Sequence, residues 1–193
     1  TNTANNSKQA LKEFSLFKPD LIILDVWLGN SDLDGIEFPL VRKSTLNTHD
    51  IQTISEQFIS YLPPEFHDVS YVTQASASLG LKGNKASMHL FFILKNPISP
   101  TVLKEWLKTL NYEIEFLANQ LKLSANGQSL SYPLDVSLAE NSKLIYIAAP
   151  KFTGLQDPIA GERLCIVNRG SPTVDVSNLV KDVNPEKVHN IGL

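Results

Sequence analysis

Residues 86–94, Ala-Ser-Met-His-Leu-Phe-Phe-Ile-Leu, are the most strand-like stretch of the sequence and decide how the fold is interpreted. Successive side chains of a strand point to opposite faces. One face is therefore wholly apolar, whereas the other places Ser87 and His89 in a row with Phe91 and Ile93. Burying a serine and a histidine costs free energy unless they are hydrogen-bonded or lie in a cleft. The pattern indicates either a functional polar row or a histidine hydrogen-bonded at the edge of a sheet.

Two further polar features accompany this strand. Lys82 and Lys85 lie in the small-residue loop just before it, which would suit a phosphate-binding site at the start of the strand. Asp135 is an isolated acid between the apolar residues Leu134 and Val136. A carboxylate in such a setting pairs with a cation, caps a turn or binds a metal. The local sequence leaves these three roles open.

Helices and strands are expected on both sides of the central strand. Helical spacing or a helix start signal predicts helices over 7–17, over 50–62 and after Ser99-Pro100. Apolar runs predict strands at 21–24, 69–72, 144–147 and 164–167. Trp106 lies on the apolar face of the helix that follows Ser99, so we expect it in the core. This order of elements predicts an α+β fold of mixed α/β layers.

Composition limits the classes of function. The 193 residues are 42% hydrophobic and 19% charged, enough to bury a core. The formal net charge of -3 weakens the case for strong nonspecific nucleic-acid binding, although a local basic groove remains compatible with it. The single cysteine, Cys165, forms no internal disulfide or cysteine-based zinc site, and we expect a buried strand thiol. No apolar run approaches the ~18 residues that a membrane span needs. We therefore expect no membrane association and a cytoplasmic location.

Ser87-Met88-His89 and Asp135 together resemble two motifs of primase-polymerases, the archaeo-eukaryotic primase superfamily, in the form found in phages and mobile elements. In that family a hydrophobic-Asp-x-Asp motif comes first, Ser-x-His on a strand comes second, and a single Asp between apolar residues comes third. The resemblance extends over about 40–175. Flanking segments that are also similar are 62–66, 74–80, 89–99, 146–150 and 157–163.

The resemblance implies an RRM-type sheet with packed helices and nucleotidyl transfer in DNA replication or priming. It implies that Asp135 and the acids of the first motif hold Mg²⁺ or Mn²⁺, which orient the reacting groups and neutralise the triphosphate. The partners would be nucleotides and single-stranded or template-primer DNA. The candidate nucleotide-binding residues are Ser87, His89, Lys85 and Arg163.

The first acidic motif has two candidates. Asp25 ends an apolar strand, but the position two residues later is Trp27 rather than an acid. Asp32 and Asp34 have the Asp-x-Asp spacing, but they lie in a polar loop. All three acids are kept as catalytic candidates beside Asp135, and Asp34 is the candidate that would share a metal with it.

Residues 6–37 resemble part of a receiver domain of the nitrogen-regulation type of response regulator, through 18–25 and 33–37. We therefore divide the chain into a partial receiver-like segment, 1–38, and a primase-polymerase-like core, 39–193. The receiver resemblance makes Asp25 a phosphoacceptor, a role that needs further acids and a lysine beside it.

Three functions follow as hypotheses. An active primase-polymerase core predicts that its motif residues converge with at least one more carboxylate. A non-catalytic nucleotide- or single-strand-binding remnant predicts the same convergence without the second acid. A phosphorelay protein predicts an exposed Asp25 with two acids and a lysine beside it.

Overall fold

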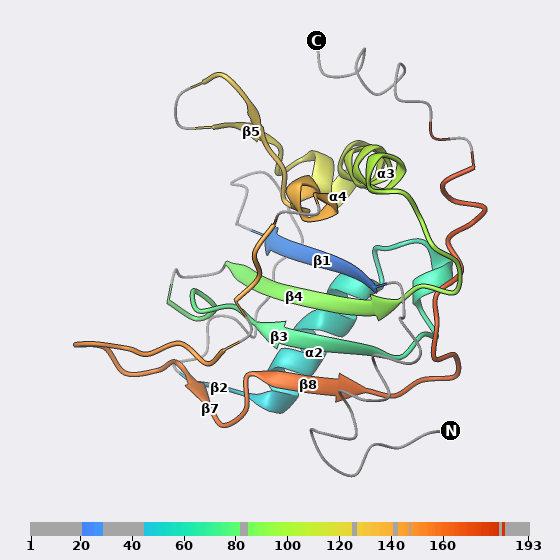
Figure 1. Cartoon of the computed structure of the whole chain (residues 1–193). Helices are drawn as coiled ribbons and strands as arrows, with labels where there is room; N and C mark the ends of the chain where they lie inside the picture. The colour runs from blue at the N-terminus through green and yellow to red at the C-terminus, as the bar shows by residue number, and fades with distance from the viewer. Residues whose placement is uncertain are drawn as a thin grey trace.

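A four-stranded antiparallel sheet forms the centre of the molecule (Figure 1). The structure, a computed structural model, describes residues 21–28, 45–81, 85–124, 127–140, 143–146, 148–181 and 183. The strand order is β1-β4-β3-β8. The strands are β1 (Leu21–Leu28), β3 (Tyr71–Ala75), β4 (Ala86–Ile93) and β8 (Leu164–Val167). With the helices packed against this sheet, the chain has the predicted α+β fold.

Helix α2 (Thr48–Ile59) crosses one face of the sheet and contacts β3, β4 and β8 (Figure 1). Helix α3 (Pro100–Glu113) packs against α4 (Glu115–Ala118) and the short 3-10 helix η3 (Val136–Ala139), which contacts β1. The remaining short elements are β2 (Leu46–Asn47), η2 (Pro64–Phe66), β5 (Lys122–Leu123), β6 (Leu130–Ser131) and β7 (Ile159–Ala160).

Local signals explain where the two long helices begin. Asn47 caps α2: its side chain accepts a hydrogen bond from the Asp50 amide, and the Asp50 carboxylate accepts one from the Asn47 amide. Ser99 caps α3 in the predicted position, and its hydroxyl accepts a hydrogen bond from the Val102 amide at 3.3 Å. Proline follows it at the first turn, where a missing amide hydrogen costs nothing.

The pairing of β1 with β4 separates two faces. It runs from Leu21 opposite Ile93 to Leu28 opposite Ala86. One face is apolar and buried, formed by Ile22, Leu24, Val26, Met88, Leu90 and Phe92. Phe66 meets the Phe92 ring edge-on at 5.0 Å and stacks on Trp106 at 6.0 Å. The prediction that Trp106 belongs to the core is confirmed, because only 2% of its surface is exposed.

The opposite face of the sheet is more open. Leu21 and Ile93 at one end, and Leu164 and Ile166 on the edge strand β8, are all exposed. We call this side the outer face. It carries the row that contains Ser87 and His89, as the alternation along the strand predicts.

Strand β1 comes from the segment that resembles a receiver domain, yet it belongs to the same sheet as the other strands. All eight of its residues pair with β4, and three of its side chains lie in the common core. Strand β1 therefore shares its core with the rest of the described chain.

Several predicted boundaries differ from the structure. The strand expected at 144–147 is wrong: residues 143–146 form no strand, and Leu144 and Tyr146 are 77% and 83% exposed. An apolar run forms a strand only where a neighbouring strand pairs with it through hydrogen bonds, and these residues have no such strand in the described ranges.

The strand expected from residue 69 begins at Tyr71, because Val69 forms only an isolated bridge to Ser171. The helix expected at 50–62 is α2, and the helix expected at 7–17 lies outside the described residues. None of the described helices is both long enough and apolar enough to cross a membrane.

Candidate functional site

Three of the predicted site residues come together where the outer face meets the β1 edge. Asp25 lies opposite His89 in the β1–β4 register, and its Oδ1 is 3.5 Å from His89 Nε2. On the other side of β1, the amide of Asp135 donates a hydrogen bond to the carbonyl oxygen of Asp25 at 2.9 Å. Asp25 therefore lies between His89 and Asp135, although the three residues belong to distant segments of the chain.

The bridge between Val26 and Leu134 explains this arrangement. These two residues form an isolated antiparallel bridge, and both are completely buried. Their neighbours, Asp25 and Asp135, are consequently directed to the outer face, because side chains alternate along extended chain. Opposed residues of antiparallel strands have Cβ atoms about 5 Å apart. The sequence patterns do not reveal this neighbourhood, which depends on segment 134–135 lying against the edge of β1.

Asn111 of α3 holds that segment in place. Its amide group donates a hydrogen bond to the carbonyl oxygen of Leu134 at 2.9 Å and accepts one from the Leu134 amide at 3.0 Å. The residue is fully buried. Asn111 is not among the predicted site residues, although an amide beside Leu107 and Leu110 on an apolar helix face is a signal of this kind of buried clamp.

Asp135 fulfils two of the three roles that its sequence left open. It caps η3, since its Oδ1 accepts a hydrogen bond from the Ser137 amide at 2.8 Å. Its Oδ2 pairs with Lys143 Nζ at 3.2 Å. Burial alone would raise the pKa of Asp135, but the hydrogen bonds from Ser137 and Lys143 outweigh it and hold this pKa below its usual range.

His89 is the most enclosed of the three charged or titratable groups, with 15% of its side chain exposed. Its ring lies edge-on to Phe91, with centroids 6.3 Å apart. The Nδ1 atom is buried and has no hydrogen-bond partner among the described residues. An unsatisfied buried nitrogen costs free energy, so this ring is held in place at some expense to stability.

Ser87 lies beneath a turn instead of facing solvent. Its hydroxyl is within hydrogen-bonding distance of Ser76 Oγ and of Ser78 Oγ, and only 5% of the residue is exposed. The three hydroxyls therefore satisfy one another. The predicted phosphate contact by Ser87 would require this turn to move.

Arg163 supports the same turn. Its Nη1 donates to the carbonyl oxygen of Ser76 at 2.7 Å, and its other nitrogen atoms donate to Asp157. The guanidinium also lies over the Phe152 ring at 5.2 Å. Every nitrogen of this buried side chain already contacts a protein group, so the structure gives Arg163 an internal structural role.

The structure says less about the remaining predicted site residues. Lys85 is partly buried and directly precedes β4. Asp32, Asp34 and Lys82 lie outside the described residues. The Trp27 backbone pairs with Ser87 in the β1–β4 register, which places this non-acidic position beside the serine.

The described residues do not fit a Mg²⁺ or Mn²⁺ centre. No group of three His, Cys, Asp or Glu side chains among them lies close enough to hold a metal ion. Asp25 and Asp135 are neighbours, but both carboxylate oxygens of Asp135 are already hydrogen-bonded. Hard divalent cations take several oxygen ligands, and a two-metal site needs carboxylates that are shared between the ions.

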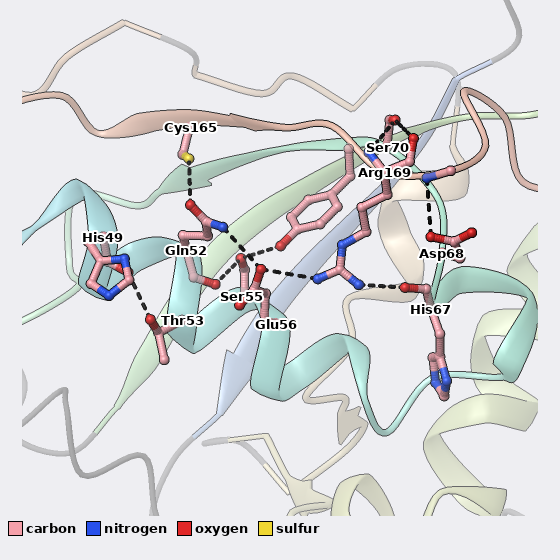
Figure 2. A network of polar contacts seen from close by, with 12 residues as sticks. His49, Gln52, Thr53, Ser55, Glu56, His67, Asp68, Ser70, Cys165 and Arg169 are labelled. Carbon is pink, nitrogen blue, oxygen red and sulfur yellow. Dashed lines mark hydrogen bonds and ion pairs between the residues drawn. The ribbon is translucent and has the colours of Figure 1, made fainter.

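A separate polar network lies on the α2 side of the sheet (Figure 2). Arg169 pairs with Glu56 of α2 at 3.1 Å and lies over the Tyr71 ring, whose hydroxyl is 2.9 Å from Ser55 Oγ. Cys165 of β8 is only partly buried, rather than buried as expected, because β8 is an edge strand of the sheet, and its Sγ donates to Gln52 Oε1 at 3.8 Å. The network ties α2 to β3, to β8 and to the segment after β8, so it stabilises the fold.

A scan against models of protein families, a search of curated proteins and a search of solved structures each find no match to this chain.

Proposed function

We propose that this chain is a primase-polymerase-like domain that binds a nucleotide on the outer face of its sheet and has lost nucleotidyl transfer. The observation that supports it is the contact of Asp25 with His89 through its side chain and with Asp135 through its backbone. His89 and Asp135 belong to the two segments that resemble primase-polymerase motifs. Their proximity is what a shared ancestral site requires.

The nucleotide would bind through two kinds of contact. The His89 ring would donate from Nε2 to a phosphate oxygen, in place of its contact with Asp25, because Nδ1 is buried. The Lys143 ammonium, which pairs with Asp135, would add positive charge. Apolar side chains of the same face, among them the half-buried Phe91 and the exposed Ile93, offer a surface on which the base stacks or packs. A nucleotide has charged phosphates and a largely apolar base. His89 and Lys143 would contact the phosphates, and the apolar side chains would contact the base.

The proposed loss of transfer concerns the acids of the first motif. Nucleotidyl transfer in primase-polymerases depends on two divalent metals, and no group of three possible ligands lies together among the described residues, which do not include Asp32 and Asp34. The position that would carry the second acid of the first motif after Asp25 is Trp27. The phosphorelay alternative is disfavoured for a similar reason, because Asp25 is paired with His89 and no group of three acids surrounds it in the described chain.

The binding proposal is tested by titrating the protein with a fluorescent ATP analogue. His89→Ala should weaken binding about tenfold, the cost of one charge-assisted hydrogen bond. His49→Ala is the matched control, since His49 is exposed on α2 and far in sequence from the site. Circular dichroism verifies that both variants are folded. Equal affinity of His89→Ala and wild type, or no binding by wild type at millimolar nucleotide, contradicts the proposal.

Nucleotidyl transfer is a second candidate, favoured by the direct opposition of Asp25 and Asp135 across the β1 edge. Primer extension with Mn²⁺ separates the two candidates. Extension by wild type that disappears in Asp135→Ala would establish transfer. Extension below detection, together with nucleotide binding, supports the non-catalytic domain.

A further inference from the structure

Lys143 pairs with Asp135, the residue that the motif resemblance makes a metal ligand. Its Nζ donates hydrogen bonds to Asp135 Oδ2 at 3.2 Å and to Ser137 Oγ at 2.6 Å. Ser137 in turn donates its amide to the other carboxylate oxygen of Asp135. The ammonium, the hydroxyl and the carboxylate therefore form a closed local arrangement in which the positive charge belongs to the chain itself.

The backbone around Lys143 is held by its own contacts. The Lys143 amide donates to the carbonyl oxygen of Glu140 at 3.1 Å, and the Glu140 amide donates to Ser137 at 3.0 Å. The Glu140 carboxylate pairs with Lys104 of α3 at 2.6 Å. The turn that carries Lys143 is consequently anchored to the same helix that holds Leu134.

The charge balance argues against a divalent metal at this position. The carboxylates of Asp25 and Asp135 and the ammonium of Lys143 sum to a single negative charge, while Asp25 also lies against His89. A dipositive ion would have to displace the ammonium and, among the described residues, would still find only the carboxylates of Asp25 and Asp135. Cation binding at sites of this kind depends on the number of negative ligands.

We propose that Lys143 is the resident cation of this site and replaces the metal that the ancestral chemistry would use. An ammonium has three donors, of which two are used by Asp135 and Ser137. The third has no partner among the described residues and could bind a phosphate oxygen, since the side chain is 38% exposed. Lys143 thus links Asp135 to the phosphate of a bound nucleotide without a metal. This inference rests on the proposed function for the identity of that ligand.

The role of Lys143 is tested first with Mn²⁺ alone, by isothermal titration of the whole chain. Wild type should bind weakly, and Lys143→Met should bind at least about tenfold more tightly, because Asp25 and Asp135 lose the competing charge. Adding Asp135→Asn to that variant should abolish the gain. Lys95→Met is the matched control, since it removes a lysine from an exposed pair with Asp175 at 3.0 Å. The inference is overturned by an unchanged affinity in Lys143→Met, by an equal gain in Lys95→Met, or by tight wild-type binding that needs Asp135.

The second measurement separates this inference from the proposed function. The ATP analogue is titrated with EDTA and then with Mn²⁺. Binding that is insensitive to EDTA and weakened by Lys143→Met supports both ideas. Binding that requires Mn²⁺ and ignores Lys143 overturns the inference and leaves the proposed function in place. Absence of binding overturns the proposed function, and the Mn²⁺ titration still decides the role of Lys143.

Discussion

The two faces of the β1–β4 pair differ sharply although they are built from alternate residues of the same strands. On the α2 side, Leu24, Leu90 and Phe92 are completely buried among other hydrocarbon side chains. On the outer side, Asp25 and His89 retain 28% and 15% exposure and contact each other. One face therefore supplies stability, while the other leaves polar groups partly exposed to solvent. The following predictions test how separate these two roles are.

The largest effect is expected from Phe92→Ala in the core. Phe92 contacts Phe66 and Tyr71, and its loss leaves a cavity, so unfolding free energy should fall by about 3–5 kcal/mol in urea denaturation. Phe91→Ala is the matched control, because it removes the same side chain from the neighbouring position on the outer face. It should cost clearly less, since Phe91 is only half-buried. Equal losses would mean that the outer face is also part of the core.

An intermediate loss of stability is expected from Asn111→Ala. Asn111 links the two faces, because it holds the buried Leu134, whose neighbour Asp135 lies at the outer face. The change removes both hydrogen bonds to Leu134 and leaves its buried peptide groups unpaired, which should cost about 1–3 kcal/mol. Because Leu134 positions Asp135, binding of the ATP analogue should weaken as well. Asn119→Ala is the control, since Asn119 is exposed at the end of α4. A loss of stability with unchanged nucleotide affinity would show that this clamp does not position the site.

The smallest effect is expected from Asp135→Asn, and it depends on pH. The pKa of Asp135 is lowered in the folded chain, so its ionised form contributes stability above the unfolded pKa. That contribution is lost as the pH falls through the folded pKa. The variant should be less stable than wild type by under about 1 kcal/mol at neutral pH, because the pair with Lys143 is exposed to solvent. Urea denaturation between about pH 6 and pH 2 should show the difference disappearing in acid. A difference that grows in acid would contradict the assigned sign.

Much of the fold could be predicted because its signals are local. The alternation of 86–94 predicted the two faces of β4, and Ser99-Pro100 marked the start of α3. Other local signals were misleading. The apolar run at 144–147 has the composition of a strand, but residues 143–146 have no partner strand in the described chain. Strand formation depends on hydrogen bonds to a distant segment, which composition does not report.

The candidate site could be predicted only in part. Ser87 and His89 share a face as expected, but the turn at Ser76 covers Ser87. The buried Arg163 side chain stabilises this turn by a hydrogen bond to the Ser76 carbonyl oxygen. The basic residue beside Asp135 is Lys143, which is not among the predicted site residues. Its role depends on a turn that brings it back to Asp135, and nothing in its immediate sequence distinguishes it from a surface lysine.

The sequence by itself determined which residues alternate, where helices are capped and which side chains share a face. These properties depend on the geometry of the chain over a few residues. Only the tertiary structure decided that Asp25 lies between His89 and Asp135, and that Lys143 neutralises Asp135. Those contacts join distant segments, and they exist because burying Val26, Leu134 and Asn111 in one core brings the polar neighbours of these residues to the same edge of the sheet.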